Sequence, residues 1–189
     1  MNWTKLADRC QLFIDGDKGL FIELLKEAEI ELTRHANILE DEQDYTADGT
    51  NSFGLPDNFK QAITVLCEGE KKKPMGDDEF NFKPDNTQHT GTPSGYTIRG
   101  NNLIFSQIPN TSDNIKLLYY SIITTSNTEK PSIPALFHRD LCDYAIAVAG
   151  AKKYPELHNK HWMIWTSNLE KVRGEMGDRE ILYDIREEI

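Results

Sequence analysis

Four side chains that could bind a metal ion occur in the last third of the sequence: His138, Cys142, His158 and His161. On helices, each of the pairs His138/Cys142 and His158/His161 would share one face. Two antiparallel helices could then bring four nitrogen and sulfur ligands together, as tetrahedral zinc requires. In the alternative, Cys142 packs as a small apolar side chain, His158 extends a tryptophan stripe, and the other two histidines are solvated at helix ends. We expect this second arrangement, with no metal and no cofactor.

Patterns typical of common catalytic sites do not occur in the sequence. It contains no GxxxxGK[ST] or GxGxxG phosphate loop, no GxSxG elbow and no HExxH pair. Acidic residues cluster at Glu40, Asp41, Glu42 and Asp44, but such a run before a strand is typical of a solvated loop. The one basic run, residues 71–73, is too short for a nucleic-acid-binding face. We therefore expect a protein that is not an enzyme.

Composition and charge exclude further classes. The 189 residues include 21 Lys and Arg against 31 Asp and Glu, a net charge of -10, which argues against wrapping duplex phosphates. No apolar run is long enough to span a bilayer, and residues 1–5 do not resemble a signal peptide. Cys10, Cys67 and Cys142 are odd in number and widely spaced, so we expect no disulfide framework and a reducing compartment.

Helices are predicted at both ends of the chain. Apolar residues recur at steps of three and four over residues 3–14 and 21–32, which predicts a helical hairpin broken at 15–17. Asp17 is placed to cap the second helix. Two more helices are predicted after Pro131, and the later one carries a heptad-like stripe at His158, Trp162, Trp165, Leu169, Val172 and Met176. These two helices would have to position the His/Cys cluster.

Strands are predicted in the middle of the chain. Residues 59–67 and 115–123 are rich in β-branched and aromatic residues, and 96–99 and 103–105 flank a turn at 100–102. The polar segment 71–94 is predicted to be mostly loop. We therefore predict an α+β fold: an antiparallel helix bundle (1–39 and 132–177) with an inserted small antiparallel β-lobe with long polar loops (40–131). An extended C-terminal tail (178–189) follows.

The predicted tail combines negative charge with large apolar side chains. Residues 175–189 include six acids and two bases. The large apolar side chains in this segment are Ile181, Leu182, Tyr183, Ile185 and Ile189. They could bind a partner, or the tail could fold back on its own domain.

Several short segments occur in an informative order. Residues 55–60 read LPDNFK, residues 95–103 read GYTIRGNNL with Ile108-Pro109 after them, and residues 115–120 read IKLLYY. A helix around LCDYA (141–145) then precedes one that carries Trp162 and Leu169. Over residues 3–176 this order resembles the head-to-tail adaptor (connector) family of tailed bacteriophages.

The resemblance implies a structural role. Such adaptors are helix bundles with an inserted β-lobe that form a ring, commonly of about twelve copies, beneath the portal protein. The C-terminal segment docks on the portal, here through Ile181, Leu182, Tyr183, Ile185 and Ile189, and the opposite end receives the tail or nozzle protein. Genomic DNA passes through the lumen without specific binding. The protein would be made in the host bacterial cytoplasm, would reside in the virion neck and would not contact a membrane.

Two alternatives stay open on the residues alone. One is a small metal-dependent enzyme that uses His138, Cys142, His158 and His161. The other is an acidic regulatory or inhibitor protein that mimics nucleic acid, which the net charge alone supports.

Overall fold

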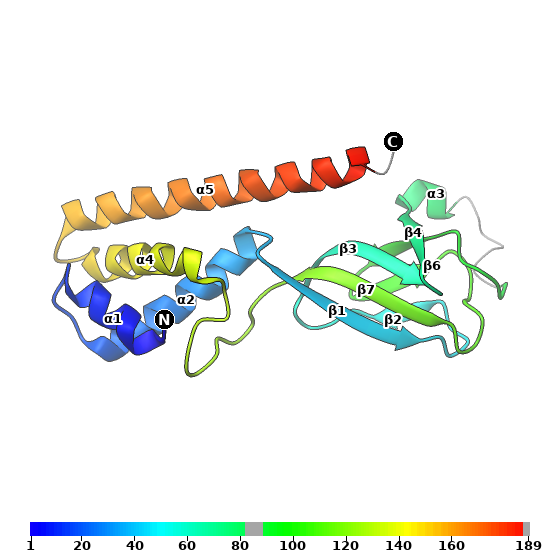
Figure 1. Cartoon of the computed structure of the whole chain (residues 1–189), viewed down its shortest axis with the longest axis horizontal. Coiled ribbons are helices and arrows are strands. Elements are labelled where there is room, and N and C mark those ends of the chain that lie inside the picture. Colours follow the sequence, from blue (N-terminus) through cyan, green and yellow to red (C-terminus); the bar gives the residue numbers. More distant parts are fainter. Residues whose placement is uncertain (82–88, 187–189) are drawn as a thin grey trace. The chain divides into compact units, whose positions relative to one another are not determined.

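The chain divides into two compact units. The computed structural model describes residues 1–81 and 89–186, with the backbone alone for 77, 81 and 175–186. The first unit, Met1–Leu39 with Ile122–Ile189, holds the long helices and is called the helical unit. The second, Glu40–Ser121, holds the sheet and is called the β unit. Each is described by itself below (Figure 1).

Four α-helices build the described part of the helical unit: α1 (Trp3–Gln11), α2 (Lys18–His35), α4 (His138–Gly150) and α5 (Pro155–Arg186). A short 3-10 turn, η2 (Ala135–Phe137), leads into α4. The Asp17 side chain accepts the Leu20 N–H at 3.1 Å, so the predicted cap of α2 is confirmed. Asn2 caps α1 in the same way.

A single hydrophobic core joins these helices. Most of the apolar stripe predicted over residues 3–14 is buried against α2 and α4, whereas Phe13 is 55% exposed. The largest fully buried side chains of this core come from α1, α2 and α4: Leu6, Phe21, Leu25, Leu32, Leu141 and Ile146. Burying each such side chain stabilises the unit by roughly 1.5–3 kcal/mol relative to exposure. Small residues at 145 and 147 of α4 are also fully buried, which allows close helix contact.

The β unit contains one seven-stranded sheet among the described residues. Its strands are β1 (Leu39–Thr46), β2 (Ser52–Gly54), β3 (Phe59–Cys67), β4 (Glu70–Pro74), β5 (Gly95–Arg99), β6 (Asn102–Phe105) and β7 (Asn114–Ser121). They lie in the order β1-β7-β3-β4-β5-β6-β2, and a short helix, α3 (Asp77–Asn81), follows β4. Strands β4 and β5 run parallel, with Lys73 opposite Gly95, whereas β3/β4, β3/β7, β5/β6 and β2/β6 are antiparallel.

Two tight turns set the register of this sheet. Gly100, at φ +57°, lies between β5 and β6 in the hairpin that the sequence predicted. Glu68 and Gly69, at φ +53° and +77°, join β3 to β4. Five side chains that are almost completely inaccessible to solvent form the centre of the β unit's own core: Val65, Leu103, Phe105, Ile115 and Leu117.

The predicted fold class was wrong. The described residues form five helices and a curled seven-stranded mixed sheet, not an antiparallel helix bundle with a small antiparallel β-lobe. The acidic run at residues 40–44 belongs to strand β1, and β4 and α3 occupy part of the predicted 71–94 loop. The predicted extended tail is also wrong as far as Arg186, because α5 continues to that residue.

Local composition explains the missed strands. Most side chains of β1 point to solvent, and β4 carries three consecutive lysines, so neither strand shows the apolar alternation that marks a strand. No helix in the described ranges is both long and apolar enough to cross a membrane.

Candidate functional site

Helix α5 is the most distinctive element of the helical unit. It has 32 residues against 13 in α4, so the two helices are about 48 and 20 Å long. They pack side by side (Figure 1), and the Asn168 amide donates to the Asp140 carboxylate at 2.8 Å, close to the start of α4. The helix therefore continues for about 18 residues beyond this contact, and we call residues 169–186 the α5 arm.

The base of α5 is anchored by aromatic side chains. Trp165 is only 3% exposed and meets the Tyr144 ring edge to face at 5.1 Å. The Tyr144 hydroxyl donates to Glu27 of α2 at 3.0 Å, and burial together with this hydrogen bond raises the pKa of Tyr144 to about 12. These contacts tie α5, α4 and α2 into one body, so the start of the arm is rigidly positioned.

The predicted tryptophan stripe is only partly core. Leu169 and Val172 pack against the hydrophobic core next to Trp165. Trp162, in contrast, is 40% exposed and stacks on the His158 ring, with ring centroids 6.0 Å apart. Met163 beside it is 70% exposed.

The portal-docking residues predicted from the sequence lie at the far end of the α5 arm. The backbone at Ile181, Leu182, Tyr183 and Ile185 is helical. Positions 181 and 185 are one turn apart, and 182 is adjacent to that face. Ile189 lies outside the described residues.

The structure does not bring the predicted His/Cys cluster together as a metal site. Among the described residues, no group of three or more His, Cys, Asp or Glu side chains could hold a metal ion. His161 Nδ1 lies 2.7 Å from Asp143 Oδ1, and His158 Nδ1 lies 2.9 Å from the Ala147 carbonyl oxygen. His138 is buried near the start of α4, and this burial lowers its pKa. Three of these residues are thus parts of the helical packing, each with its own neighbours.

The fourth member, Cys142, has a different neighbour. Its Sγ lies 3.9 Å from the Leu6 carbonyl oxygen on α1. Cys142 and Cys10 are both buried in the core of the helical unit. Sequence reasoning missed that Cys142 contacts α1, whose predicted apolar face carries both Leu6 and Cys10.

A second polar surface lies on the β unit, where the predicted acidic cluster forms part of strand β1. Lys116 of β7 contacts two of these acids, with its Nζ 3.2 Å from Glu42 Oε2 and 3.5 Å from Asp44 Oδ1. The hydrogen bond to Glu42 and the nearby negative charges raise the pKa of Lys116. These contacts hold the acidic strand against the neighbouring strand β7.

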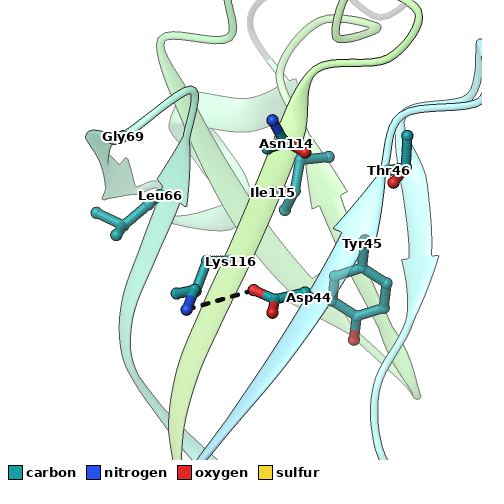
Figure 2. A pocket seen from close by; sticks show the side chains of 8 residues that line it. All are labelled: Asp44, Tyr45, Thr46, Leu66, Gly69, Asn114, Ile115 and Lys116. Carbon is teal, nitrogen blue, oxygen red and sulfur yellow. Dashed lines mark ion pairs between the residues drawn. The ribbon is translucent and has the colours of Figure 1, made fainter.

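Beside this ion pair is an open groove of about 400 Å³ (Figure 2). Its lining side chains are Asp44, Tyr45, Thr46, Leu66, Asn114, Ile115 and Lys116, with the backbone of Gly69. The Lys116 ammonium points to the Asp44 carboxylate, so the two opposite charges of the groove already neutralise each other.

Comparison with known proteins agrees with the order of motifs. A family model described as SU10 adaptor protein matches residues 1–181, which include both units and most of the α5 arm. No curated protein matches the chain. Since the family model covers nearly the whole chain, including the segments singled out in the sequence, the chain belongs to the SU10 adaptor protein family, a family of phage head-to-tail adaptors.

Proposed function

We propose that this chain forms a ring beneath the portal protein, joins the portal to the tail, and lines the channel through which the genome leaves the head. Membership in the adaptor family supports the coarser statement that the protein is a structural adaptor of a phage. Its place is then the virion neck, with the portal and tail components as partners.

The observation that carries the proposal is the α5 arm. Helix α5 continues about 27 Å beyond the hydrogen bond between Asn168 and Asp140, and we propose that the turns after Leu169 and Val172, which pack on the core, bind another protein. The five apolar residues proposed to dock on the portal are Ile181, Leu182, Tyr183, Ile185 and Ile189. Apolar side chains spaced among charges on a helix suit insertion into a groove of a partner.

The ring and its channel rest on charge and symmetry. A closed ring of about twelve identical copies needs heterologous contacts, in which one face of a copy fits a different face of its neighbour. With a net charge of -10 each, copies repel one another at low salt, so we propose that the ring forms on the portal, where apolar burial offsets the repulsion. An acidic lumen would keep DNA from adhering during passage.

The test of docking is co-sedimentation with the purified portal of the same phage. We expect the double variant Ile181→Asp/Ile185→Asp to lose at least about 10-fold in affinity, because both charges would enter the apolar contact. Met163→Asp is the matched control, since it places the same charge on an exposed position of α5 before the arm. Sedimentation of the free protein at low salt should show a monomer.

Two results would contradict the proposal. The double variant could bind the portal as tightly as the unmodified protein, which would exclude docking through the arm. Immunogold labelling of phage particles could also place the protein away from the single head–tail vertex, which would exclude the neck position itself.

A further inference from the structure

The sheet of the β unit is open, and β1 and β2 are its two edge strands. At an edge, every second residue turns its N–H and C=O groups away from the sheet, where another strand could pair with them. Ala47, directly after β1, faces the start of β7, because its N–H donates to the Asp113 carbonyl oxygen and its own carbonyl oxygen accepts from Ser112. These directions alternate along an extended strand, so the backbone groups of Glu42 and Asp44 face outward.

Side chains of β1 itself bind two of these outward groups. The Asp41 carboxylate accepts the Glu42 N–H through Oδ1 at 2.9 Å, and the Gln43 amide donates to the Asp44 carbonyl oxygen at 2.8 Å. The Asp41 side chain is also held in place, since its Oδ2 accepts the Asn58 amide at 3.1 Å. A second strand could therefore bind these backbone groups only after both side chains had been displaced.

The opposite edge of the sheet is closed in a similar way. Leu55, directly after β2, donates its N–H to the Asn101 carbonyl oxygen at 2.9 Å, so the backbone of Gly54 beside it faces away from β6. The Tyr45 hydroxyl donates to the outward carbonyl oxygen of Gly54 at 2.7 Å. Side chains thus bind outward backbone groups at both edges of the sheet.

We propose that Asp41 and Gln43 are edge caps, which keep a second copy of this chain from adding a strand to the sheet at β1. A second copy is the partner that must be excluded, because it carries the same edge. Two β1 edges could pair antiparallel about a two-fold axis. The ring and the portal contact do not enter this inference, so its test is separate from that of the proposed function.

The size of the effect follows from the hydrogen bonds that pairing would break. Each side-chain hydrogen bond lost weakens association roughly 5-fold. Pairing of two β1 edges breaks the two caps on each copy, so the caps together weaken it roughly 600-fold.

Negative charge is the other feature that could keep this edge free. The exposed acids of β1, namely Glu40, Asp41, Glu42 and Asp44, would approach the same acids of the second copy. Salt separates the two effects. In about 1 M salt the Debye length is only about 3 Å, so repulsion between exposed charges is largely screened, whereas the caps remain.

The test is sedimentation velocity of the full-length protein in about 1 M sodium chloride over a range of concentrations. We expect the unmodified protein to stay a monomer. The double variant Asp41→Leu/Gln43→Met removes both caps at similar side-chain size and should dimerise roughly 600-fold more tightly. Hydrogen exchange should then show that the Glu42 and Asp44 amides gain protection as the concentration rises.

Matched variants separate the caps from charge and from apolar surface. Asp41→Asn loses the same charge but keeps a side-chain acceptor oxygen, so it should stay a monomer. Glu40→Leu adds a similar apolar side chain to β1 and leaves both caps, so it should also stay a monomer. Gln43→Met alone changes no charge and should dimerise roughly 25-fold more tightly than the unmodified protein, which decides the question even if the double variant does not fold.

Three results would overturn the proposal. The double variant, or Gln43→Met in its place, could stay a monomer over the whole range of concentrations. It could also dimerise without protection of Glu42 and Asp44, which would locate the contact elsewhere. Finally, the unmodified protein could pair through β1 in about 1 M salt, which would show that charge alone keeps the edge free.

Discussion

Glu29 of α2 is a fully buried carboxylate that holds the segment before η2 and α4. Its Oε1 accepts the backbone N–H of Ser132 at 2.5 Å and that of Ile133 at 3.3 Å. Its Oε2 is buried without a hydrogen-bond partner among the described residues. The side chain is 0% exposed, so both N–H groups are bound by a carboxylate inside the protein. This contact fixes where the chain enters the helix on which α5 packs.

Replacing Glu29 by alanine tests this role. The substitution leaves two buried N–H groups without an acceptor, at a cost of about 1–3 kcal/mol each. Loss of the unpartnered Oε2 offsets roughly 1 kcal/mol, because a buried polar atom without a partner is itself unfavourable. We therefore expect the free energy of unfolding to fall by about 3 kcal/mol. Glu29→Gln keeps one carbonyl acceptor and should cost only about 1 kcal/mol.

Urea denaturation followed by tryptophan fluorescence measures this change in the right part of the molecule. All three tryptophans of the chain, Trp3, Trp162 and Trp165, belong to the helical unit. With a slope of about 2 kcal/mol per molar urea, Glu29→Ala should lower the midpoint by about 1.5 M.

Glu23→Ala is the matched control, because Glu23 is an exposed glutamate on the same helix. Its midpoint should stay within about 0.3 M of the unmodified protein. If Glu29→Ala and Glu23→Ala unfold at the same urea concentration, the hydrogen bonds from the two N–H groups to Glu29 do not contribute to the free energy of unfolding. The account of how α4 is positioned would then be refuted.

Two further predictions concern the parallel strand pair and a buried histidine. A Cβ on Gly95 would lie 2.6 Å from the Lys73 carbonyl oxygen, so Gly95→Ala should cost about 2 kcal/mol and lower amide protection in β4 and β5. Gly54→Ala, with open space around its Cβ, should leave protection unchanged, and equal protection in both variants would contradict the clash. Burial lowers the pKa of His138 in the folded chain below 6.5. On acidification the unfolded chain therefore binds a proton at His138 at a higher pH than the folded chain does, and the free energy of unfolding falls as the pH drops through about 6.5. His138→Gln should show a shallower loss between about pH 7.5 and 5.5 in the same urea assay, and an unchanged slope would exclude His138 as the cause.

Local sequence determined those parts of the molecule whose causes are local. The apolar stripe of α1, the cap at Asp17 and the turn at Gly100 each depend on residues within a few positions of one another. The order of short motifs also indicated the adaptor family, since motif order is a property of the chain itself.

Only the tertiary structure decided the features that depend on distant neighbours. The acidic strand β1 is stabilised by pairing with β7, and the parallel contact between Lys73 and Gly95 joins strands separated by a helix. Neither pairing leaves an apolar pattern in its own segment, because strand hydrogen bonds come from the backbone and not from side chains.

The same distinction applies to the side chains that could bind a metal ion. Helical spacing placed His138 and Cys142 on one face, but the packing of α4 within the core brought Cys142 to the Leu6 carbonyl oxygen of α1. Which side chains meet depends on how the helices pack, and the repeat along one helix does not contain that information. Spacing therefore determined which residues share a face, and packing decided what that face contacts.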